Sequence, residues 1–300
     1  MNFFIPSYIK LLNSGELKKR VDQALKLLEE CTVCARYCHV NRLKGELGVC
    51  KVGRFARVAS YGPHHGEEDV LRGWNGSGTI FFSGCSLSCQ YCQNFAISQD
   101  PKSGYEVSAE KLADIMLELQ HSGCHNINLV TPSHVVPQIL EAVYIAAQKG
   151  LSLPLVYNTG GYDSLEMLKI LDGIIDIYMP DMKYADEKLA RKYSKVKDYP
   201  QINQKAVLEM HRQAGDLIVN DKGLAVKGLL IRHLVLPNNI GGTKEIMHFI
   251  ATKISKNTYI NIMDQYFPSY KAHKYPEIDR RLTKEEFEEA IRAAHDEGLY

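Results

Sequence analysis

Six stretches with the pattern of β-strands alternate with helical patterns between residues 79 and 263, and this alternation constrains the fold more than any other feature. The strand patterns cover residues 79–82, 126–131, 154–157, 174–179, 228–236 and 258–263. Strands that alternate with helices form a parallel sheet with right-handed crossovers. Because six units are fewer than the eight of a closed barrel, we expect a partial barrel or a doubly wound sheet. Both folds place their active sites at the carboxyl ends of the strands.

The helical patterns carry start and stop signals. Capping residues mark three expected helix starts: Ser108, the pair Asp163 and Glu166, and the pair Thr283 and Glu286. A further helix is expected to end at Gly150. Other helical patterns cover residues 15–30, 186–193, 201–213 and 244–254.

The chain of 300 residues is about twice as long as a typical domain, so one large domain with additions is expected. We predict three regions. Residues 1–74 form an N-terminal helix and a cysteine-rich metal-binding extension, residues 75–264 form the α/β barrel, and residues 265–300 form a closing segment with a C-terminal helix.

The composition gives no sign of a membrane or nucleic-acid protein. The formal net charge is +1, so no strong field attracts nucleic acid or an anionic bilayer. No apolar run approaches the roughly 18 residues that a membrane span needs. The N-terminus lacks the order of a signal peptide, since Pro6 and Lys10 interrupt its apolar stretch. We therefore expect a cytoplasmic protein in a reducing or anaerobic setting, with no membrane or nucleic-acid partner.

Seven of the eight cysteines lie between Cys31 and Cys92, and Cys124 stands alone as an expected buried apolar residue. Clustered cysteines in a chain with no secretory signal are read as metal ligands rather than disulfides. Cys85, Cys89 and Cys92 follow the first strand directly. Structural zinc sites and cubane clusters both have four protein ligands. Three thiolates therefore leave one coordination position of the metal centre open, as a reactive centre requires. The alternatives are zinc with a fourth ligand from elsewhere, or simple burial.

This three-cysteine loop, Cys85-x3-Cys89-x2-Cys92 with Tyr91 before the third cysteine, resembles the signature of the radical S-adenosylmethionine (SAM) superfamily. The resemblance implies a partial (β/α)6 TIM-type barrel. It also implies that the three cysteines hold a [4Fe–4S] cluster, with SAM on the fourth iron. An electron from the cluster then cleaves SAM, and the 5′-deoxyadenosyl radical abstracts a hydrogen atom. No catalytic residue beyond the cluster is predicted.

Three further segments resemble pyruvate formate-lyase activating enzymes, and most closely their X-type relatives: Asn158 to Tyr162, Asp181 to Lys183, and Ile231 to His233. The Gly66-Glu67-Glu68 stretch and residues 261–266 belong to the same likeness, which covers about residues 30–295. One feature departs from it. The second strand ends at Thr131 and Pro132 instead of in a Gly-Gly-Glu turn, so Thr131 and nearby carbonyls are expected to bind the methionine amino group.

The resemblance and the strand positions together predict the cofactor-binding residues, which are Tyr91, Thr131, Asn158, Thr159, Asp181, Lys183 and Arg232. Asp181 and Lys183 lie on one face of an extended segment, beside the expected SAM, with a surface salt bridge as the alternative. Arg232 and His233 point opposite ways, so only one faces the barrel interior, where it meets the cofactor carboxylate or the substrate. The alternative there is a buried structural ion pair. For His64, His65, Glu67 and Glu68 we favour a solvated or capping role over metal binding.

A second set, Cys31, Cys34, Cys38 and Cys50, has enough thiolates to close a tetrahedral zinc site or to hold a complete auxiliary iron–sulfur cluster. Cationic neighbours such as Arg36, Arg42 and Lys44 help to stabilise several thiolates in either case. The pattern leaves zinc and iron–sulfur equally open. A metal at this set is expected to cover the barrel or to relay an electron.

The expected function is a radical SAM oxidoreductase that abstracts hydrogen, with activation of a glycyl radical enzyme as the sharper hypothesis. The alternative is radical modification of another protein, peptide or small molecule. Flavodoxin or ferredoxin is the expected reducing partner. A metal-stapled binding module for RNA predicts a basic face with aromatic residues, and no such run is present. A simple electron carrier would not need so large a scaffold.

Overall fold

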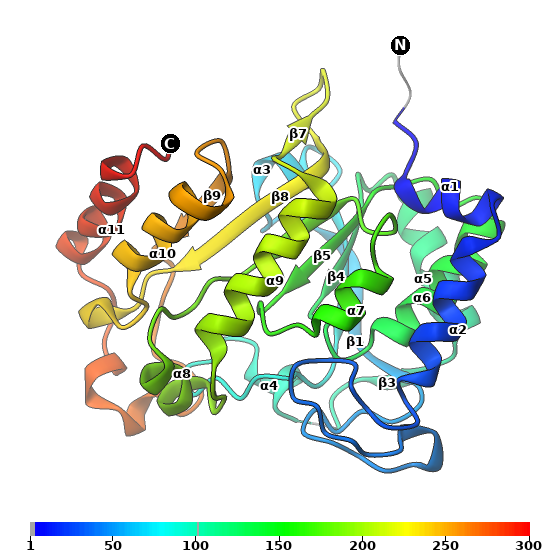
Figure 1. The fold of residues 1–300 in the computed structure, drawn as a ribbon, viewed down its shortest axis with the longest axis horizontal. Helices are drawn as coiled ribbons and strands as arrows, with labels where there is room; N and C mark the ends of the chain where they lie inside the picture. The colour runs from blue at the N-terminus through cyan, green and yellow to red at the C-terminus, as the bar shows by residue number, and fades with distance from the viewer. Residues whose placement is uncertain (1–3, 101) are drawn as a thin grey trace.

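The computed structural model describes residues 4–100 and 102–300 and confirms the six predicted parallel strands. These are β2 (Ser77–Phe82), β4 (Ile127–Val130), β5 (Leu155–Thr159), β6 (Ile177–Pro180), β8 (Ala225–Leu234) and β9 (Tyr259–Met263). They pair in this order, with Leu129 opposite both Ile80 and Tyr157. The sheet does not close on itself, so the fold is a partial TIM-type barrel, as predicted (Figure 1).

Three further strands are not predicted from the pattern: β1 (Ala56–His64), β3 (Tyr105–Val107) and β7 (Ile218–Val219). β1 runs antiparallel between β2 and β3. Its second half contains Gly62 and Pro63, which are poor strand residues. That half pairs with β2 alone, so the missing N–H of Pro63 breaks no second ladder.

Helices lie around the sheet (Figure 1). They are α1 (Ser7–Asn13), α2 (Glu16–Lys26), α3 (Asp69–Arg72), α4 (Phe95–Ser98), α5 (Ala109–His121), α6 (Val136–Gln148), α7 (Leu165–Ile170), α8 (Glu187–Ser194), α9 (Tyr199–Ala214), α10 (Thr243–Phe249) and α11 (Lys284–Asp296). The longer helices α5, α6 and α9 cover the outer face of the sheet. A π-helical turn, Ile250–Ile254, continues α10. Strand alternation sends Ile80 and Leu129 outward, where they join the main apolar core with Met116 of α5 and Val143 of α6.

Two of the predicted helix caps are confirmed and one is wrong. The Ser108 side chain accepts a hydrogen bond from the backbone N–H of Lys111, and Thr283 with Glu286 forms a complete capping box. Asp163 does not cap α7, which begins after Ser164. Its carboxylate is buried and instead accepts hydrogen bonds from the hydroxyls of Tyr157 and Thr159 at 2.8 and 2.7 Å.

The cysteine-rich segment, residues 31–55, lies across the carboxyl ends of the strands (Figure 1). Cys34 makes a β-bridge with Asp163, which follows β5. Arg36 donates to the carbonyl of Ser86 after β2 at 2.6 Å, and Arg42 donates to the carbonyl of His134 after β4 at 2.8 Å. The segment is therefore attached to three successive strand ends, where the active site of such a fold is expected.

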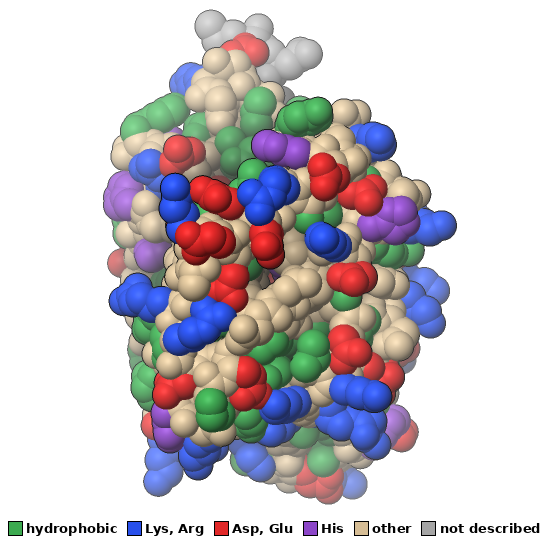
Figure 2. All heavy atoms as spheres, turned by 90° about the vertical axis from the view of Figure 1, so that its left-hand side faces the viewer, with side chains coloured by type: hydrophobic (Ala, Val, Ile, Leu, Met, Phe, Trp, Pro, Cys, Tyr) green, Lys and Arg blue, Asp and Glu red, His purple; other side chains and the backbone are tan. Residues whose placement is uncertain are grey.

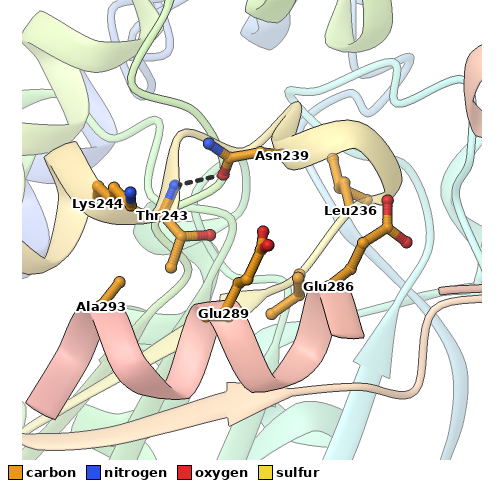
Figure 3. A pocket seen from close by; sticks show the side chains of 9 residues that line it. Leu236, Asn239, Thr243, Lys244, Glu286, Glu289 and Ala293 are labelled. Atoms are coloured by element: carbon orange, nitrogen blue, oxygen red, sulfur yellow. Dashed lines mark hydrogen bonds between the residues drawn. The ribbon is translucent and has the colours of Figure 1, made fainter. Parts of the chain in front are cut away.

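α11 closes the other side of the molecule against α10. Between them is a cavity of about 40 Å³, with Asn239 and Thr243 on one wall and Glu286 and Glu289 on the other (Figure 3). The backbone N–H of Thr243 donates to the Asn239 side chain at 3.1 Å across this wall. The space is enough for a water molecule or two but not for a nucleoside, so this cavity is not the candidate site.

Acidic and basic side chains are interspersed over the face seen in Figure 2, with no large surface of one sign. Across residues 4–100 and 102–300, no helix is both long enough and apolar enough to cross a bilayer.

Candidate active site

The three-cysteine loop leaves β2 and brings three thiols to the carboxyl end of the sheet. The Cys85 Sγ accepts from the backbone N–H of Leu87 at 3.3 Å. Cys89 Sγ lies 3.0 Å from the Ser194 hydroxyl, and Cys92 Sγ lies 3.2 Å from a second serine hydroxyl, that of Ser98. Each sulfur thus already has one hydrogen-bonding neighbour, which would support a thiolate charge.

Burial raises the pKa of the Cys85 thiol to about 12 and that of Cys89 to about 11. The Lys183 ammonium opposes this rise at both sulfurs. Thiols with such pKa values are protonated at neutral pH unless a metal displaces the protons, because metal ligation requires the thiolate. The loop is therefore suited to a bound cation and not to a free nucleophilic cysteine.

A pocket of about 200 Å³ opens beside this loop. Its walls combine Cys89, Tyr91, Cys92, Gln93 and Asn94 with Asp181, Lys183, Arg232, Leu234, Met263 and Gln265. The cysteine loop after β2 and the ends of β6, β8 and β9 thus meet at one place. Four of the seven residues predicted to bind the cofactor, along with two of the three cysteines, are close together here.

Asp181 is the centre of a buried charge network in this pocket. Its carboxylate accepts from Lys183 Nζ at 2.5 Å and from Arg232 Nε at 3.1 Å. Burial alone would raise the pKa of Asp181, but the two cations outweigh it and hold the pKa below its usual value. The side chains of these three residues are 15–19% exposed, so the group is not a surface salt bridge.

Arg232 and His233 confirm that only one of two neighbouring strand residues faces the interior. Arg232 points inward and also donates to the Asn158 side chain at 2.6 Å. His233 is fully buried on the opposite face, 2.7 Å from the Met182 carbonyl and 2.9 Å from the Thr243 hydroxyl. Since a carbonyl only accepts, Nδ1 carries the proton and Nε2 accepts from Thr243.

The sequence does not predict the side-chain partners of Glu67 and Glu68. The solvated role favoured for Glu67 is wrong, whereas Glu68 occupies the N-cap position of α3 without a side-chain cap hydrogen bond. The Glu67 side chain is 8% exposed and lies 3.7 Å from Arg232. Glu68 accepts from Asn261 of β9 at 2.9 Å. Burial raises the pKa of Glu67, whereas the Arg232 charge opposes it. The sequence groups Glu67 and Glu68 with His64 and His65 and with a family likeness, but no local pattern reveals a partner so far along the chain.

The barrel interior also holds polar atoms without a partner. Both side-chain amide atoms of Asn128 on β4 are buried and have no hydrogen-bond partner among the described residues, and Glu68 Oε2 is in the same condition. Unpaired buried polar atoms are costly. Neither residue lines the pocket beside the three-cysteine loop, and the Asn128 amide lies near Glu67, where it opposes the rise in pKa that burial causes.

Tyr91 lines the pocket and also packs beneath it, whereas Thr131, Asn158 and Thr159 do not line it. Tyr91 is buried, its hydroxyl accepts from Tyr184 at 2.7 Å, and its ring packs edge-on against Tyr266. The Thr159 hydroxyl is bound to Asp163 and Ser133 at 2.7 and 2.8 Å, on the outer side of β5. Thr131 follows β4, is half-buried, and is not among the residues that line the pocket. Cofactor binding by Tyr91, Thr131 and Thr159 stays a prediction.

In the part of the chain that the structure describes, no three His, Cys, Asp or Glu side chains are spaced to hold a single metal ion. Thiolates on a cubane bind different irons, so they stand farther apart than ligands of one ion. The absence of such a group therefore does not count against a cluster at the three-cysteine loop.

The comparisons with known proteins agree with this geometry. The sequence pattern of the radical SAM superfamily matches residues 79–250. An uncharacterised protein of Methanocaldococcus jannaschii is 32% identical over 290 residues, which are 94% of this chain and 79% of that protein.

Two solved structures share the fold at low sequence identity. Methylornithine synthase (PylB) has 15% identity and a TM-score of 0.50, over 99% of this chain and 75% of that one. Streptococcus suis SuiB, bound to the precursor peptide SuiA, has 13% identity and a TM-score of 0.50. The match covers 73% of this chain but only 45% of SuiB, so this chain spans less than half of that protein.

Proposed function

Because the chain belongs to the radical SAM superfamily, we propose that Cys85, Cys89 and Cys92 hold the [4Fe–4S] cluster and that the adjoining pocket binds SAM. The superfamily uses this cluster and SAM. When bound, the pair supplies one-electron cleavage of the sulfonium, which yields methionine and a 5′-deoxyadenosyl radical that abstracts hydrogen from a substrate. The observation that carries the proposal is the pocket that joins two of these cysteines to the Asp181 network.

The residues of the chain have separable tasks in this proposal. Arg232 donates its Nε to Asp181 and its Nη2 to Asn158 and lies 3.7 Å from Glu67, so it positions these polar groups. Lys183 donates one N–H to Asp181 and has two others. Both cations line the pocket, and Lys183, with the less directional ammonium, would meet the cofactor carboxylate. Apolar Leu234 and Met263 on the pocket wall limit the access of water to the radical.

The proposal is tested by anaerobic reduction of cluster-loaded protein in the presence of SAM. We expect 5′-deoxyadenosine and methionine in equal amounts. Substitution of Cys89 by Ser should abolish both products, whereas substitution of the remote Cys124 by Ser should leave them unchanged. A cluster-loaded, reduced sample that makes no 5′-deoxyadenosine contradicts the proposal.

The substrate class is a second proposal. The segments around Asn158, Asp181 and Arg232 resemble activating enzymes, and this supports hydrogen abstraction from a glycine of a partner protein. The ending of the second strand at Thr131, without a Gly-Gly-Glu turn, favours the broader function in which the substrate is another protein, peptide or small molecule. SuiB shares the fold and is bound to a precursor peptide, which supports a peptide as one candidate.

Isotope transfer distinguishes these substrates. Deuterium that passes from a labelled candidate into 5′-deoxyadenosine identifies the molecule that is attacked. A glycyl radical signal on an added partner protein supports activation, whereas deuterium from a peptide or small molecule without that signal supports the broader function. Flavodoxin or ferredoxin is the proposed electron donor, to be compared with a chemical reductant in the same assay.

A further inference from the structure

We propose that Cys31, Cys34, Cys38 and Cys50 hold a second iron–sulfur cluster, which fixes the cysteine-rich segment over the carboxyl ends of the strands. The proposal is independent of SAM cleavage, because it concerns thiols that do not line the pocket beside the three-cysteine loop. It would stand even if the function proposed above were wrong.

The four thiols lie in one short segment that has little regular structure. Cys31, Cys34 and Cys50 are buried, Cys38 is half-buried, and all four are free thiols. So short a segment has no apolar core of its own to fix four buried thiols, and a metal centre would supply the missing constraint.

The backbone around these thiols repeats a feature of the three-cysteine loop. The N–H of Leu87 donates to Cys85, two residues before it. The backbone N–H of Arg36 likewise forms a hydrogen bond to Cys34, and the backbone N–H of Val52 forms one to Cys50. Backbone N–H groups that face a sulfur stabilise negative charge on it, as they do at iron–sulfur sites.

The strongest sign of an absent anion is Arg42. This side chain is 1% exposed, and a buried charge needs a counter-charge. Its guanidinium donates to the carbonyls of Gly53 and His134 and lies 3.9 Å from Cys31 Sγ. In residues 4–100 and 102–300, no carboxylate lies within ion-pair distance of it. A cluster with four thiolate ligands carries net negative charge, which this cation would balance.

The spacing favours iron–sulfur over zinc. Structural zinc sites commonly pair two short motifs, each with two ligands. Here three cysteines lie within eight residues and the fourth follows later, which is the three-plus-one arrangement of ferredoxin-type clusters.

The second site would lie directly against the three-cysteine loop. A Cβ atom on Gly84 would be 2.5 Å from the carbonyl oxygen of Cys50, so only a glycine fits between Cys50 and Cys85. Arg36 holds the same loop by its hydrogen bond to Ser86. A cluster here would therefore order the loop that is proposed to bind the first one.

Iron, sulfide and zinc analysis of two complementary variants tests the proposal. In the first, Cys85, Cys89 and Cys92 are changed to Ala, and anaerobic reconstitution should leave about four irons and four sulfides per chain. In the second, Cys31, Cys34, Cys38 and Cys50 are changed to Ala, and the metal content should again fall to about half that of the wild type. Cys124→Ala is the matched control and should keep the full content of about eight irons.

One zinc without sulfide in the first variant, or a folded first variant with no metal, overturns the proposal. If the first variant does not fold, the wild-type protein decides, since about eight irons support a second cluster and about four irons contradict it. The same measurements distinguish a failure of the function proposed above from a failure of the second-cluster proposal. A protein with eight irons that does not cleave SAM refutes that function and leaves the second site intact.

Discussion

Arg232 Nε lies 3.1 Å from Asp181 Oδ1, and this contact joins the ends of β6 and β8 on the floor of the candidate site. The same two residues form a β-bridge, and the N–H of Met182 donates to the carbonyl of Arg232 at 2.8 Å. Backbone and side chains therefore fix one another, so the carboxylate stays in place without help from a ligand. Such preorganisation is what a site for a charged cofactor requires.

Asp181→Asn tests how much this buried network contributes. The amide keeps the shape but leaves Lys183 and Arg232 without their shared anion, so we expect the free energy of unfolding to fall by about 3–5 kcal/mol. Urea unfolding of the metal-free protein measures this loss. The matched control is Asp114→Asn, which removes an exposed ion pair with Lys149 and should cost less than about 1 kcal/mol. Equal losses in the two variants would show that the buried network is not special.

The stability that Asp176 contributes to the fold changes with pH in the opposite direction to the contribution of an ordinary ion-paired carboxylate. Burial raises its pKa from 3.8 to about 6, although its oxygens accept from the N–H groups of Ser7 and Leu155 at 2.8 and 3.0 Å. The folded state therefore binds a proton more readily than the unfolded chain. The resulting stabilisation is complete below pH 3.8 and is lost as the pH rises through about 6.

Comparison with Asp176→Asn isolates this effect. The free energy of unfolding of the wild type minus that of the variant should fall by up to about 3 kcal/mol between pH 4 and pH 7. Unfolding by urea at several pH values measures the difference. A difference that is flat or rises with pH would mean that Asp176 is ionised without penalty in the folded protein.

We predict that stability and iron content both require a glycine at position 84, because its backbone conformation and its surroundings both disfavour a side chain. Its φ is +79°, and an added Cβ would meet the Cys50 carbonyl at 2.5 Å. Gly150 has a φ of +94° but nothing within 4 Å of such an atom. Gly150→Ala should therefore cost about 1–2 kcal/mol for the backbone alone. Gly84→Ala should cost about 2–5 kcal/mol and also lower the iron content, because the three-cysteine loop must shift.

Ser194 and Ser98 are expected to tune the proposed cluster at Cys85, Cys89 and Cys92. Their hydroxyls lie 3.0 and 3.2 Å from the sulfurs of Cys89 and Cys92. Hydrogen bonds to cluster sulfurs stabilise the reduced, more negative state. Ser194→Ala should lower the reduction potential by on the order of tens of millivolts, measured by a redox titration followed by EPR. A potential that rises or stays unchanged while the iron content is normal contradicts this role.

The sequence contains enough information to predict the six parallel strands, because each is an apolar run between turn residues. It also predicts that Asp181 and Lys183 follow the fourth of these strands and that Arg232 lies within the fifth. It does not contain the pairing of Glu67 with Arg232, which depends on how β1 returns the chain to the barrel floor. β1 itself is missed because Gly62 and Pro63 conceal it. The Asp163 capping box fails because a buried carboxylate gains more from two hydroxyls on β5 than from an exposed helix end.

Asn158 and Thr159 are neighbours that the sequence treats alike, whereas the structure separates them. Asn158 points inward and accepts from Arg232, but the Thr159 hydroxyl points outward to Asp163. We therefore expect Asn158→Ala to lower the unfolding free energy by about 1.5–3 kcal/mol, the cost of a lost hydrogen bond to a charged group, and to raise the KM for SAM because Arg232 loses a partner that fixes it on the pocket wall. Thr159→Val should leave that KM unchanged and lower the unfolding free energy by about 1–3 kcal/mol, because Asp163 loses a buried donor. SAM cleavage kinetics and urea unfolding of both variants decide the matter. A raised KM in Thr159→Val at unchanged stability would give Thr159 the cofactor contact that the sequence predicts for it.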